Sequence, residues 1–255
     1  MAKIPYDDRD GFIWMDGDFV PWRDTKVHVL THGLHYASSV FEGERAYSGK
    51  IFKSREHSER LHKSANILGF ELPFSVDEIE DAKKETLAKA GLEDAYVRPI
   101  AWRGSEMMGV SAQSNTIHLA IAVWHWGDYF ADKMKGIRMT NATWRRPDPK
   151  TAPCDAKAAG LYMICTMSKH DAERDGYQDA LMLDWRGHVA EATGANIFFI
   201  RDGAIHTPTP DCFLNGITRR TAMELAKARN IEIIERTIMP DELSTFSECF
   251  ITGTA

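Results

Sequence analysis

Apolar and polar residues alternate along the first half of the chain in a way that predicts short strands and hairpins. The segment 12–22 places two apolar stretches around Asp16-Gly17, a dipeptide typical of two-residue β-turns, and it predicts a β-hairpin. Runs rich in β-branched and aromatic residues predict further strands, at 27–30, 45–47, 51–52, 95–102 and 116–124.

Two helices are predicted between these strands, each with a recognisable start. The first is expected at about 55–68, with Ser54 as its N-cap. The second is expected at about 76–90, where Ser75 and Glu78 have the spacing of a capping box. Both have apolar residues at helical spacing, so each should pack one face against the strands.

The second half repeats this mixture and indicates a second domain. Strands are predicted at 137–142, 179–184, 189–191, 196–201, 204–206, 231–235 and 248–252, and helices at 161–174 and 218–229. The stretch 125–136 has neither period, so we interpret it as a linker between domains at 1–124 and 137–255. The fold class expected is α+β in two domains, with hairpins prominent in both.

Composition narrows the classes of function. The 255 residues are 44% hydrophobic and 27% charged, and 31 basic against 37 acidic residues give a net charge of −6. An acidic chain disfavours binding to nucleic acids or anionic membranes. Four separated cysteines, a polar N-terminus and no apolar run of membrane-spanning length favour a cytoplasmic protein with reduced thiols.

Lys157 is the first candidate for chemistry, because its surroundings are unusual. Its neighbours are all very small: Ala156, Ala158, Ala159 and Gly160. A surface lysine needs no such surroundings, whereas a lysine whose amine must approach a bulky planar partner does. The alternative is an ordinary lysine flanked by helix-forming alanines, and both interpretations stay open at this point.

Two Gly-Thr segments are candidates for binding an anion. The first, 214–220, places Gly216 and then Ile217-Thr218 at the start of an amphipathic helix, where free backbone N–H groups suit a phosphate. The alternative there is an ordinary helix start capped by Thr218. The second, 252–255, ends a strand with small residues and is either an anion-binding turn or a simple turn.

A buried acid and a strand arginine complete the candidates. Glu191 lies among small residues between two apolar strands, where a carboxylate needs a partner such as a protonated ring nitrogen, a cap or an arginine. Tyr96 and Arg98 share one strand face and together suit a carboxylate, although strand arginines more often meet solvent or a neighbouring acid.

Three nearby histidines raise the question of a metal site. His28, His32 and His35 would not converge in a strand and turn, and no acidic residue lies between 27 and 40 to complete a ligand set. We therefore expect packing and hydrogen bonding here, and no metal. Walker, dinucleotide-binding, serine-hydrolase and zinc-protease motifs are all absent.

A lysine among small residues, a phosphate-binding helix start and an acid for a ring nitrogen together describe a pyridoxal 5'-phosphate site. With these motifs the sequence resembles the branched-chain amino acid aminotransferases, which are fold-type IV pyridoxal phosphate enzymes. The resemblance covers about 12–255 and rests on these segments: His32–Tyr36, Phe41–Gly43, Arg55–His62, Tyr96–Pro99, Met108–Val110, Lys157–Gly160, Glu191–Asn196, Gly216–Thr218 and Gly253–Ala255.

The resemblance implies roles for individual residues. Lys157 would be catalytic, binding the cofactor covalently and moving the proton. Cofactor binding would involve Arg60, Tyr162, Glu191, Ile217, Thr218 and Thr254, with Glu191 at the ring nitrogen and Tyr162 at the phenolic oxygen. Substrate binding would involve Tyr36, Phe41, Tyr96, Arg98, Val110, Trp126, Thr254 and Ala255, with Arg98 at the distal carboxylate of glutamate or 2-oxoglutarate.

The resemblance also implies an architecture and an assembly. It implies a small α/β sandwich domain, a larger pseudo-barrel domain that is incomplete at its C-terminal end in this chain, and a homodimer or a dimer-based hexamer. The segment 108–110 is the candidate loop that closes the neighbour's site. The activity implied belongs to branched-chain amino acid biosynthesis. The alternatives are a D-amino-acid or (R)-amine transaminase of the same fold type, and an inactive binding or assembly module.

Overall fold

The computed structural model describes residues 4–127 and 135–254, which form two compact units. Unit 1 contains 4–127 and also Ala156–Gly160, and unit 2 contains 135–155 and 161–254. Most of the predicted linker, at 128–134, lies outside the described residues, so the three-part domain division stays a prediction. The segment Ala156–Gly160 contains Lys157, and it therefore belongs to unit 1 while the chain around it belongs to unit 2.

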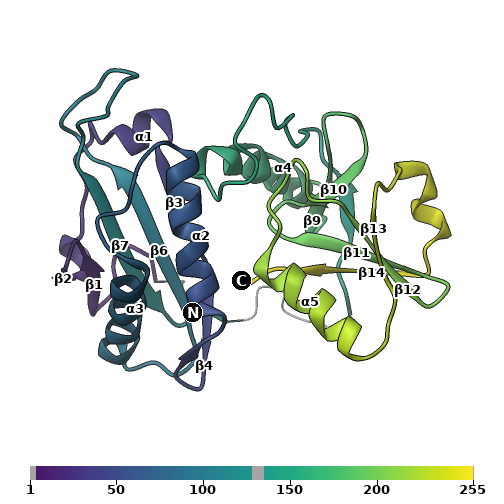
Figure 1. Ribbon diagram of the computed structural model, residues 1–255, viewed down its shortest axis with the longest axis horizontal. Helices are drawn as coiled ribbons and strands as arrows, with labels where there is room; N and C mark the ends of the chain where they lie inside the picture. The colour runs from purple at the N-terminus through teal and green to yellow at the C-terminus, as the bar shows by residue number, and fades with distance from the viewer. Residues whose placement is uncertain (1–3, 128–134, 255) are drawn as a thin grey trace. The chain divides into compact units, whose positions relative to one another are not determined.

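Unit 1 is built on one antiparallel sheet (Figure 1). Its strands are β1 (Phe12–Met15), β2 (Asp18–Pro21), β3 (Ser39–Phe41), β4 (Glu44–Tyr47), β5 (Lys50–Ile51), β6 (Ala95–Arg103) and β7 (Ile117–Trp124). The order is β2-β1-β7-β6-β4-β5, and β3 pairs with the other half of β6. The long strand β6 therefore pairs with β3 in one half and carries Tyr96 and Arg98 in the other.

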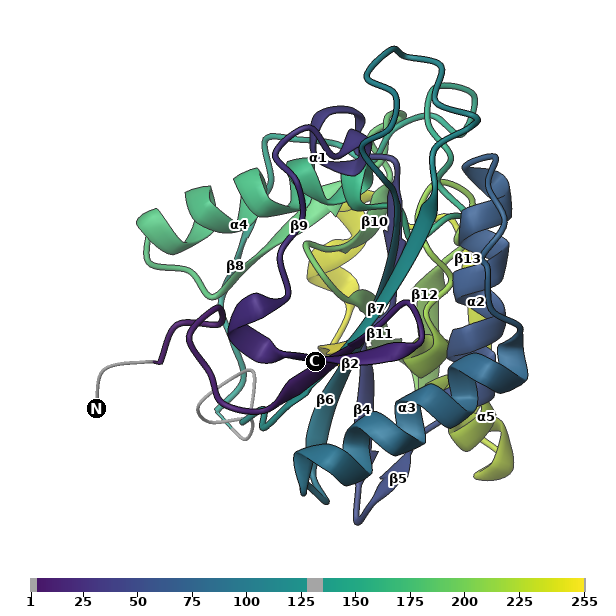
Figure 2. The same cartoon turned by 90° about the vertical axis from the view of Figure 1, so that its left-hand side faces the viewer.

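Helices α2 (Ser54–Ile67) and α3 (Val76–Ala90) pack against each other, and α3 also packs against β1, β6 and β7 (Figures 1 and 2). A short helix, α1 (His32–Tyr36), contacts β6, and a 3-10 turn covers Trp22–Asp24. The core lies between the long helices and the sheet and includes the fully buried Leu61, Ile79 and Leu119. Burial of this kind is the main source of the unit's stability.

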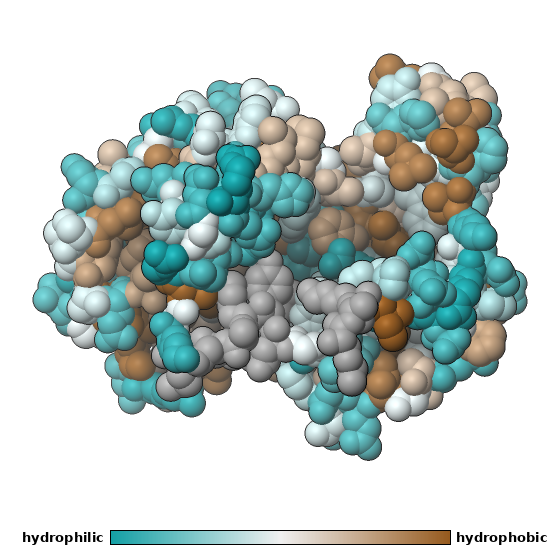
Figure 3. Space-filling model, turned by 180° about the vertical axis from the view of Figure 1, so that it is seen from behind, coloured by the Kyte–Doolittle hydropathy of each residue, from teal (hydrophilic) through white to brown (hydrophobic). Residues whose placement is uncertain are grey.

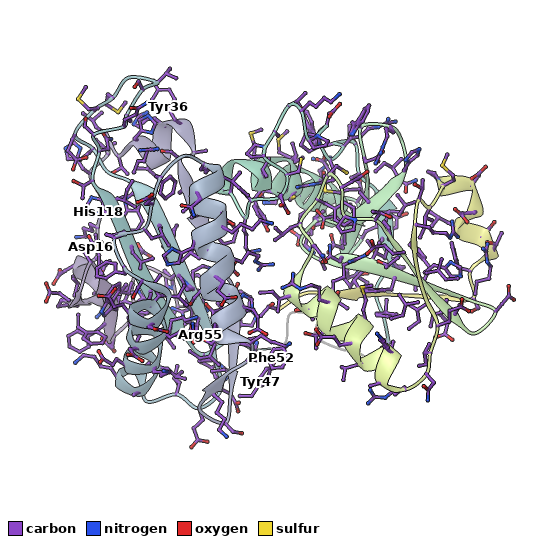
Figure 4. The ribbon with its side chains drawn as sticks, viewed as in Figure 1. Asp16, Tyr36, Tyr47, Phe52, Arg55 and His118 are labelled. Carbon is purple, nitrogen blue, oxygen red and sulfur yellow. The ribbon has the colours of Figure 1, made fainter. Side chains whose placement is uncertain are left out.

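The predicted hairpin at 12–22 is confirmed, together with its turn. Asp16 and Gly17 both have positive φ, 54° and 104°, as a two-residue turn of this hand requires. Asp16 also accepts hydrogen bonds from the backbone N–H of Leu119, at 2.8 Å, and from Nδ1 of His118, at 2.7 Å (Figure 4). The turn is therefore attached to β7 as well as closing its own hairpin.

Two local predictions are wrong. The segment 27–30 is not a strand but an exposed turn, closed by the N–H of Thr31 on the carbonyl of His28, and none of the described strands pairs with it. Ser54 is not an N-cap: it is the first residue of α2, its hydroxyl donates to Glu80, and Lys53 precedes the helix with a φ of 52°. The capping box of α3 is confirmed on both sides, at Ser75 and Glu78.

Unit 2 contains two sheets and two helices. A three-stranded sheet has the order β10-β9-β8, and a four-stranded sheet has the order β13-β12-β11-β14, in which only β12 and β13 are parallel. The strands are β8 (Met139–Asn141), β9 (Asp179–Leu183), β10 (Val189–Ala192), β11 (Asn196–Arg201), β12 (Ala204–Pro208), β13 (Ile233–Arg236) and β14 (Glu248–Thr252).

The helices of unit 2 are α4 (Met163–Arg174) and α5 (Ile217–Ala228). Helix α4 packs on β9, and α5 packs on β13 and β14. Further 3-10 turns cover Ala159–Tyr162 and Pro240–Thr245. Among the described residues, every helix is too short or too polar to span a membrane. The acid of the sequence analysis, Glu191, lies on β10, and the proposed phosphate-binding turn begins α5.

Candidate active site

Lys157 is fixed in unit 1 through its own backbone. Its N–H donates to Ser64 Oγ at 2.9 Å, and its carbonyl accepts from the N–H of Phe41 at 3.1 Å. Its neighbour Ala158 forms an isolated bridge with Val40 in β3. The small residues noted in the sequence therefore serve this close approach: Ala156 and Ala158 are buried, and a Cβ on Gly160 would lie 3.1 Å from the Cβ of Ala37.

The Lys157 amine belongs to a continuous group of predicted site residues. Its Nζ lies 4.9 Å from the centre of the Phe41 ring, and the Arg98 guanidinium lies 4.7 Å from the same ring. Arg98 Nη2 donates to Tyr96 Oη at 2.8 Å. The Tyr96 ring lies 5.1 Å from that of Trp126. Unit 1 thus brings together an amine, a guanidinium, a phenol and apolar rings, which together can bind an apolar chain and a carboxylate.

Gly43 makes room for the Tyr96 hydroxyl. A Cβ built on Gly43 would lie 2.1 Å from Tyr96 Oη, a distance that no side chain tolerates. The φ of Gly43 is not in the left-handed region, so the requirement here is for space rather than for backbone freedom. The glycine of the 41–43 motif therefore has a direct structural reason beside the predicted substrate group.

Arg60, the predicted phosphate ligand of unit 1, extends from α2 and is largely buried. Its side chain is 12% exposed, and it donates to both carboxylate oxygens of Glu42, each at 2.7 Å. His57, one turn earlier on α2, also hydrogen bonds to Glu42. Phe41 and Glu42 are consecutive residues, so one short segment contacts both the lysine and the arginine of the candidate site.

Glu191 has two partners in unit 2. Arg146 Nε lies 3.3 Å from Glu191 Oε1, and Asn196 Nδ2 donates to Oε2 at 3.2 Å. Glu191 and Arg146 are 9% and 4% exposed. Burial lowers the pKa of Arg146, but the negative charge of Glu191 outweighs this and leaves that pKa above its ordinary value. The Arg146 guanidinium thus supplies the positive charge that a buried carboxylate needs beside it.

Asn196 connects this acid with the start of α5. Its Oδ1 accepts from the N–H of Gly216 at 3.2 Å, and its Nδ2 also donates to the carbonyl of Leu214 at 3.0 Å. A Cβ on Gly216 would lie 2.3 Å from Asn196 Oδ1, so this close approach requires glycine. The acid and the candidate anion site of unit 2 are therefore held in a fixed relation by one amide.

The start of α5 has the features of an anion site. No side chain caps the helix at Gly216, and Ile217 and Thr218 form its first turn. The Thr218 hydroxyl lies 3.2 Å from that of Thr254, which follows β14. Unsatisfied first-turn N–H groups, the helix dipole and two hydroxyls are a donor set that suits a phosphate. A phosphorylated cofactor with a basic ring nitrogen therefore fits the donors that unit 2 presents.

Two predicted residues of unit 1, Tyr36 and Val110, have surroundings other than the Phe41 group. Tyr36 stacks on His32 at 4.5 Å and donates to the carbonyl of Met108, at the end of unit 1 opposite the β4–β5 hairpin with Tyr47 (Figure 4). Val110 is 84% exposed, and Tyr162 is half-buried just before α4. Tyr162 of unit 2 is close to Arg146, the partner of Glu191, because Arg146 Nη1 donates to the carbonyl of the adjacent Leu161 at 3.4 Å. Ala255 lies outside the described residues.

His32 confirms the expectation that the histidines pack and hydrogen bond. Its Nδ1 lies 2.6 Å from Ser38 Oγ and its Nε2 lies 3.0 Å from the carbonyl of Gly109. Both ring nitrogens are therefore used within unit 1. The ring connects α1 to the loop that carries Met108 and Val110.

A different group in the described residues has converging ligand atoms, namely Asp184, Asp211 and Cys212. Arg186 Nη2 lies 2.6 Å from Asp184 and 2.7 Å from Asp211, so a guanidinium already balances both carboxylates. Burial raises the pKa of the Cys212 thiol, which disfavours the thiolate that a metal would need. We assign no metal to this group.

Three residues that shape the site were not predicted from the sequence. Arg146 pairs with Glu191 from a loop 45 positions away, and Ser64 binds the Lys157 backbone from α2. Glu42 stood within a quoted motif, but no role was assigned to it. Glu42 has no solvent exposure, and burying an acid without a cation beside it costs free energy. The apolar residues near Glu42 in the sequence were therefore a signal that a cation lies beside it.

Comparison with known proteins gives consistent matches over nearly the whole chain. The model of the amino-transferase class IV family matches residues 39–255. A protein of Rickettsia felis named probable branched-chain-amino-acid aminotransferase is 44% identical over 245 residues, which are 95% of this chain and 83% of that protein.

Solved structures give the same picture. The branched-chain amino acid aminotransferase of Escherichia coli superposes with a TM-score of 0.93 at 38% identity, covering 97% of this chain and 84% of that one. The branched-chain aminotransferase of the thermophilic archaeon Thermoproteus uzoniensis, solved with norvaline, gives a TM-score of 0.93 at 36% identity, covering 97% and 84%.

Proposed function

This chain belongs to the class IV aminotransferase family, and we propose that it transfers the amino group of L-leucine, L-isoleucine or L-valine to 2-oxoglutarate with pyridoxal 5'-phosphate as cofactor. The products are a branched 2-oxo acid and L-glutamate. The matches confirm the family and the fold expected from the sequence. The observation that carries the proposal is the contact of Phe41 with both the Lys157 amine and the Arg98 guanidinium.

For the cofactor we propose the roles that the sequence resemblance gives to individual residues. Arg60 and the first turn of α5, with Thr218 and Thr254, would bind the phosphate. Glu191, which lies beside Arg146, would pair with the ring nitrogen. A related branched-chain aminotransferase was solved in complex with N-(5'-phosphopyridoxyl)-L-glutamate, which supports both the pyridoxal cofactor and glutamate as a reactant. The roles of Ile217 and Tyr162 rest on the sequence resemblance.

Lys157 is the residue that we assign to covalent binding and to proton transfer. When bound, the pyridoxal ring accepts the electron pair that proton removal leaves on the substrate α-carbon. The Lys157 amine, which would hold the cofactor covalently, would take the proton from the substrate α-carbon as a base and deliver it as an acid to the cofactor carbon that receives the nitrogen. The two backbone hydrogen bonds at Lys157 fix the origin of this side chain, and its amine lies over the Phe41 ring.

The substrate site must bind an apolar branched side chain in one half of the reaction and the distal carboxylate of 2-oxoglutarate or glutamate in the other half. The rings of Phe41 and Trp126 supply apolar surface, to which the resemblance adds Tyr36 and Val110. Arg98 would bind the distal carboxylate of glutamate or 2-oxoglutarate. Tyr96, Thr254 and Ala255 would face the α-carboxylate, a role that stays a prediction for each of them.

The direct test compares Lys157→Ala with Lys150→Ala, an exposed lysine of the loop before it. The wild type and Lys150→Ala should show the same visible absorption band with pyridoxal 5'-phosphate and the same turnover of L-leucine with 2-oxoglutarate. Lys157→Ala should lose the band and nearly all turnover, because no amine remains to bind the cofactor covalently. An unchanged band and turnover in Lys157→Ala would overturn the assignment.

A second assay separates the proposal from its alternatives. Turnover of L-leucine with none of D-alanine supports the branched-chain reaction, whereas the opposite preference indicates a D-amino-acid transaminase. A folded protein that binds no pyridoxal 5'-phosphate would indicate a binding or assembly module instead. The match to branched-chain aminotransferases favours the first outcome.

We propose that the protein is cytoplasmic and acts as a homodimer or a dimer-based hexamer. Large side chains with apolar surface are exposed around α1 and the loop after β6, namely Val29, Leu34, Tyr36, Met107 and Val110. Figure 3 shows hydrophobic residues on the surface of the molecule. Exposed apolar surface of this kind supports association. Sedimentation of the purified protein measures the assembly, and a monomer at working concentration would contradict it.

A further inference from the structure

Glu42 is one of the most deeply buried charged residues of unit 1, and it is bound from two directions. Its side chain has no solvent exposure. Arg60 donates through Nε to Oε1 and through Nη2 to Oε2, both at 2.7 Å, and His57 Nδ1 lies 2.7 Å from Oε2. A carboxylate bound in parallel by the two nitrogens of one guanidinium edge is the most directional ion pair that proteins form.

The charges of this triad are well defined. Burial raises the pKa of Glu42, but the charge and hydrogen bonds of Arg60, with the hydrogen bond of His57, outweigh it and bring that pKa to about 2. Burial lowers the pKa of His57 despite its bond to Glu42. An ionised carboxylate only accepts hydrogen bonds, so a neutral His57 must carry its proton on Nδ1 and donate it.

We propose that Glu42 is a positioning residue, which fixes the Arg60 guanidinium so that it can bind the cofactor phosphate, and that His57 fixes Glu42 in turn. The proposal rests on the proposed function, which makes Arg60 a phosphate ligand. An arginine side chain loses much rotamer freedom when it binds an anion. The bidentate contact with Glu42 fixes the guanidinium plane before the phosphate arrives, and directs the Nη1 edge away from Glu42.

The neighbouring acid Glu44 provides a matched control. It is as buried as Glu42 and two residues further along, but it binds Lys83, at 2.9 and 3.2 Å, rather than a predicted ligand. Lys83 is itself fully buried and also contacts Glu80 and the carbonyl of Ser54. Loss of either carboxyl group disturbs a buried contact with a basic side chain under the same helices. Only loss of Glu42 should disturb the phosphate ligand.

The experiment measures the binding of pyridoxal 5'-phosphate and of pyridoxal, which lacks the phosphate, by visible absorption. Wild type, Glu42→Gln and Glu44→Gln are compared, each checked for folding by circular dichroism. Glu42→Gln should raise the Kd for pyridoxal 5'-phosphate by about tenfold or more and leave the Kd for pyridoxal unchanged, because hydrogen bonds to charged groups contribute at this level. Glu44→Gln should leave the ratio of the two Kd values at the wild-type value.

A double variant tests whether Glu42 acts through Arg60. Arg60→Ala should lose the preference for the phosphorylated form, and adding Glu42→Gln to it should cause no further loss in that ratio. An additional loss in the double variant would overturn the positioning role. An unchanged ratio of the two Kd values in Glu42→Gln would also overturn the positioning role. The proposed function would still stand in that case, because the wild type would bind pyridoxal 5'-phosphate.

Two further outcomes remain decisive. If Glu42→Gln does not fold, Glu42→Asp replaces it: this variant keeps the charge but is too short to reach both guanidinium nitrogens, so a smaller loss in the same ratio is expected, and an unchanged ratio overturns the inference. If the wild type binds neither pyridoxal compound, the proposed function fails, and the inference fails with it.

Discussion

At the scale of single residues, the segment 41–43 performs three different tasks in three consecutive positions. Phe41 contacts the lysine and the arginine of the candidate site, Glu42 is buried against Arg60 and His57, and Gly43 leaves room for the Tyr96 hydroxyl. The segment begins at the last residue of β3 and continues the pairing with β6 through the N–H of Glu42, which donates to the carbonyl of Pro99. Substitutions at these three positions should therefore have distinct consequences.

Arg98 gives a prediction about substrate choice. Arg98→Ala should raise the KM for 2-oxoglutarate by about tenfold or more, because a carboxylate loses its charged partner, with much less effect on the KM for 2-oxoisocaproate. Steady-state kinetics with both 2-oxo acids measures the difference.

Arg103→Ala is the control for this variant, because Arg103 lies on the same strand but donates to the carbonyls of Ala112 and Gly69. It should change neither KM appreciably. Equal losses for the two 2-oxo acids in Arg98→Ala would show that Arg98 does not discriminate the distal carboxylate.

The predictability of single residues depended on whether their partner was close in sequence. Lys157, Glu191 and Gly216 were recognisable because unusual small or apolar neighbours surround them in the chain. The pairing of Glu191 with Arg146, and of Lys157 with Ser64, brings together residues far apart in sequence. No local pattern specifies such a contact, so the sequence indicated that Glu191 needed a partner without identifying it.

At the scale of elements, α3 shows how local signals define a helix completely. Ser75 Oγ accepts from the N–H of Glu78, the Glu78 carboxylate accepts from the N–H of Ser75, and Gly91 ends the helix with a φ of 64°. The strand predicted at 27–30 shows the opposite case. Its apolar residues had the right composition but no neighbouring strand, and pairing is what makes a strand.

Ser75 gives a stability prediction for this element. Ser75→Ala should lower the free energy of unfolding by about 1 kcal/mol, because two N–H groups at the helix start lose part of their capping. Urea unfolding at neutral pH measures it, with the exposed Ser105 of the loop after β6 as control. A change of the same size in Ser105→Ala would mean that the cap itself contributes nothing.

At the scale of the whole molecule, each unit contains an acid that links its stability to pH. The pKa of Glu42 in unit 1 is about 2, through Arg60 and His57 acting against burial. The pKa of Glu242 in unit 2 is also about 2, chiefly through hydrogen bonds from Arg236. The ordinary pKa of both carboxyl groups is 4.5, well above their pKa in the folded protein. As the pH falls through the range between these two pKa values, the unfolded chain therefore binds more protons than the folded chain.

The stability contributed by these two acids should therefore be complete above pH 4.5 and be lost progressively as the pH falls toward about 2. Urea unfolding midpoints at several pH values measure this loss. Glu44, whose pKa burial raises to about 8 against the opposing effect of Lys83, titrates above this window and does not contribute to it.

Glu42→Gln is the informative variant for this measurement, because it removes one of the two groups. Its unfolding midpoint should depend less steeply on pH below 4.5 than that of the wild type. A wild-type midpoint that stays constant over this range would show that neither acid is stabilised by its ion pair.

The segment Ala156–Gly160 has a consequence for the order in which the molecule is built. It completes unit 1, although its contact with Ser64 spans 93 positions of the chain. Contacts of such long separation form late in folding, since a large loop must close first. During synthesis, residues 4–127 leave the ribosome before the segment that pairs with Val40. Lys157 is thus among the last residues of unit 1 to leave the ribosome, and the nascent chain can place this side chain on unit 1 only after residues 4–127 have been synthesised.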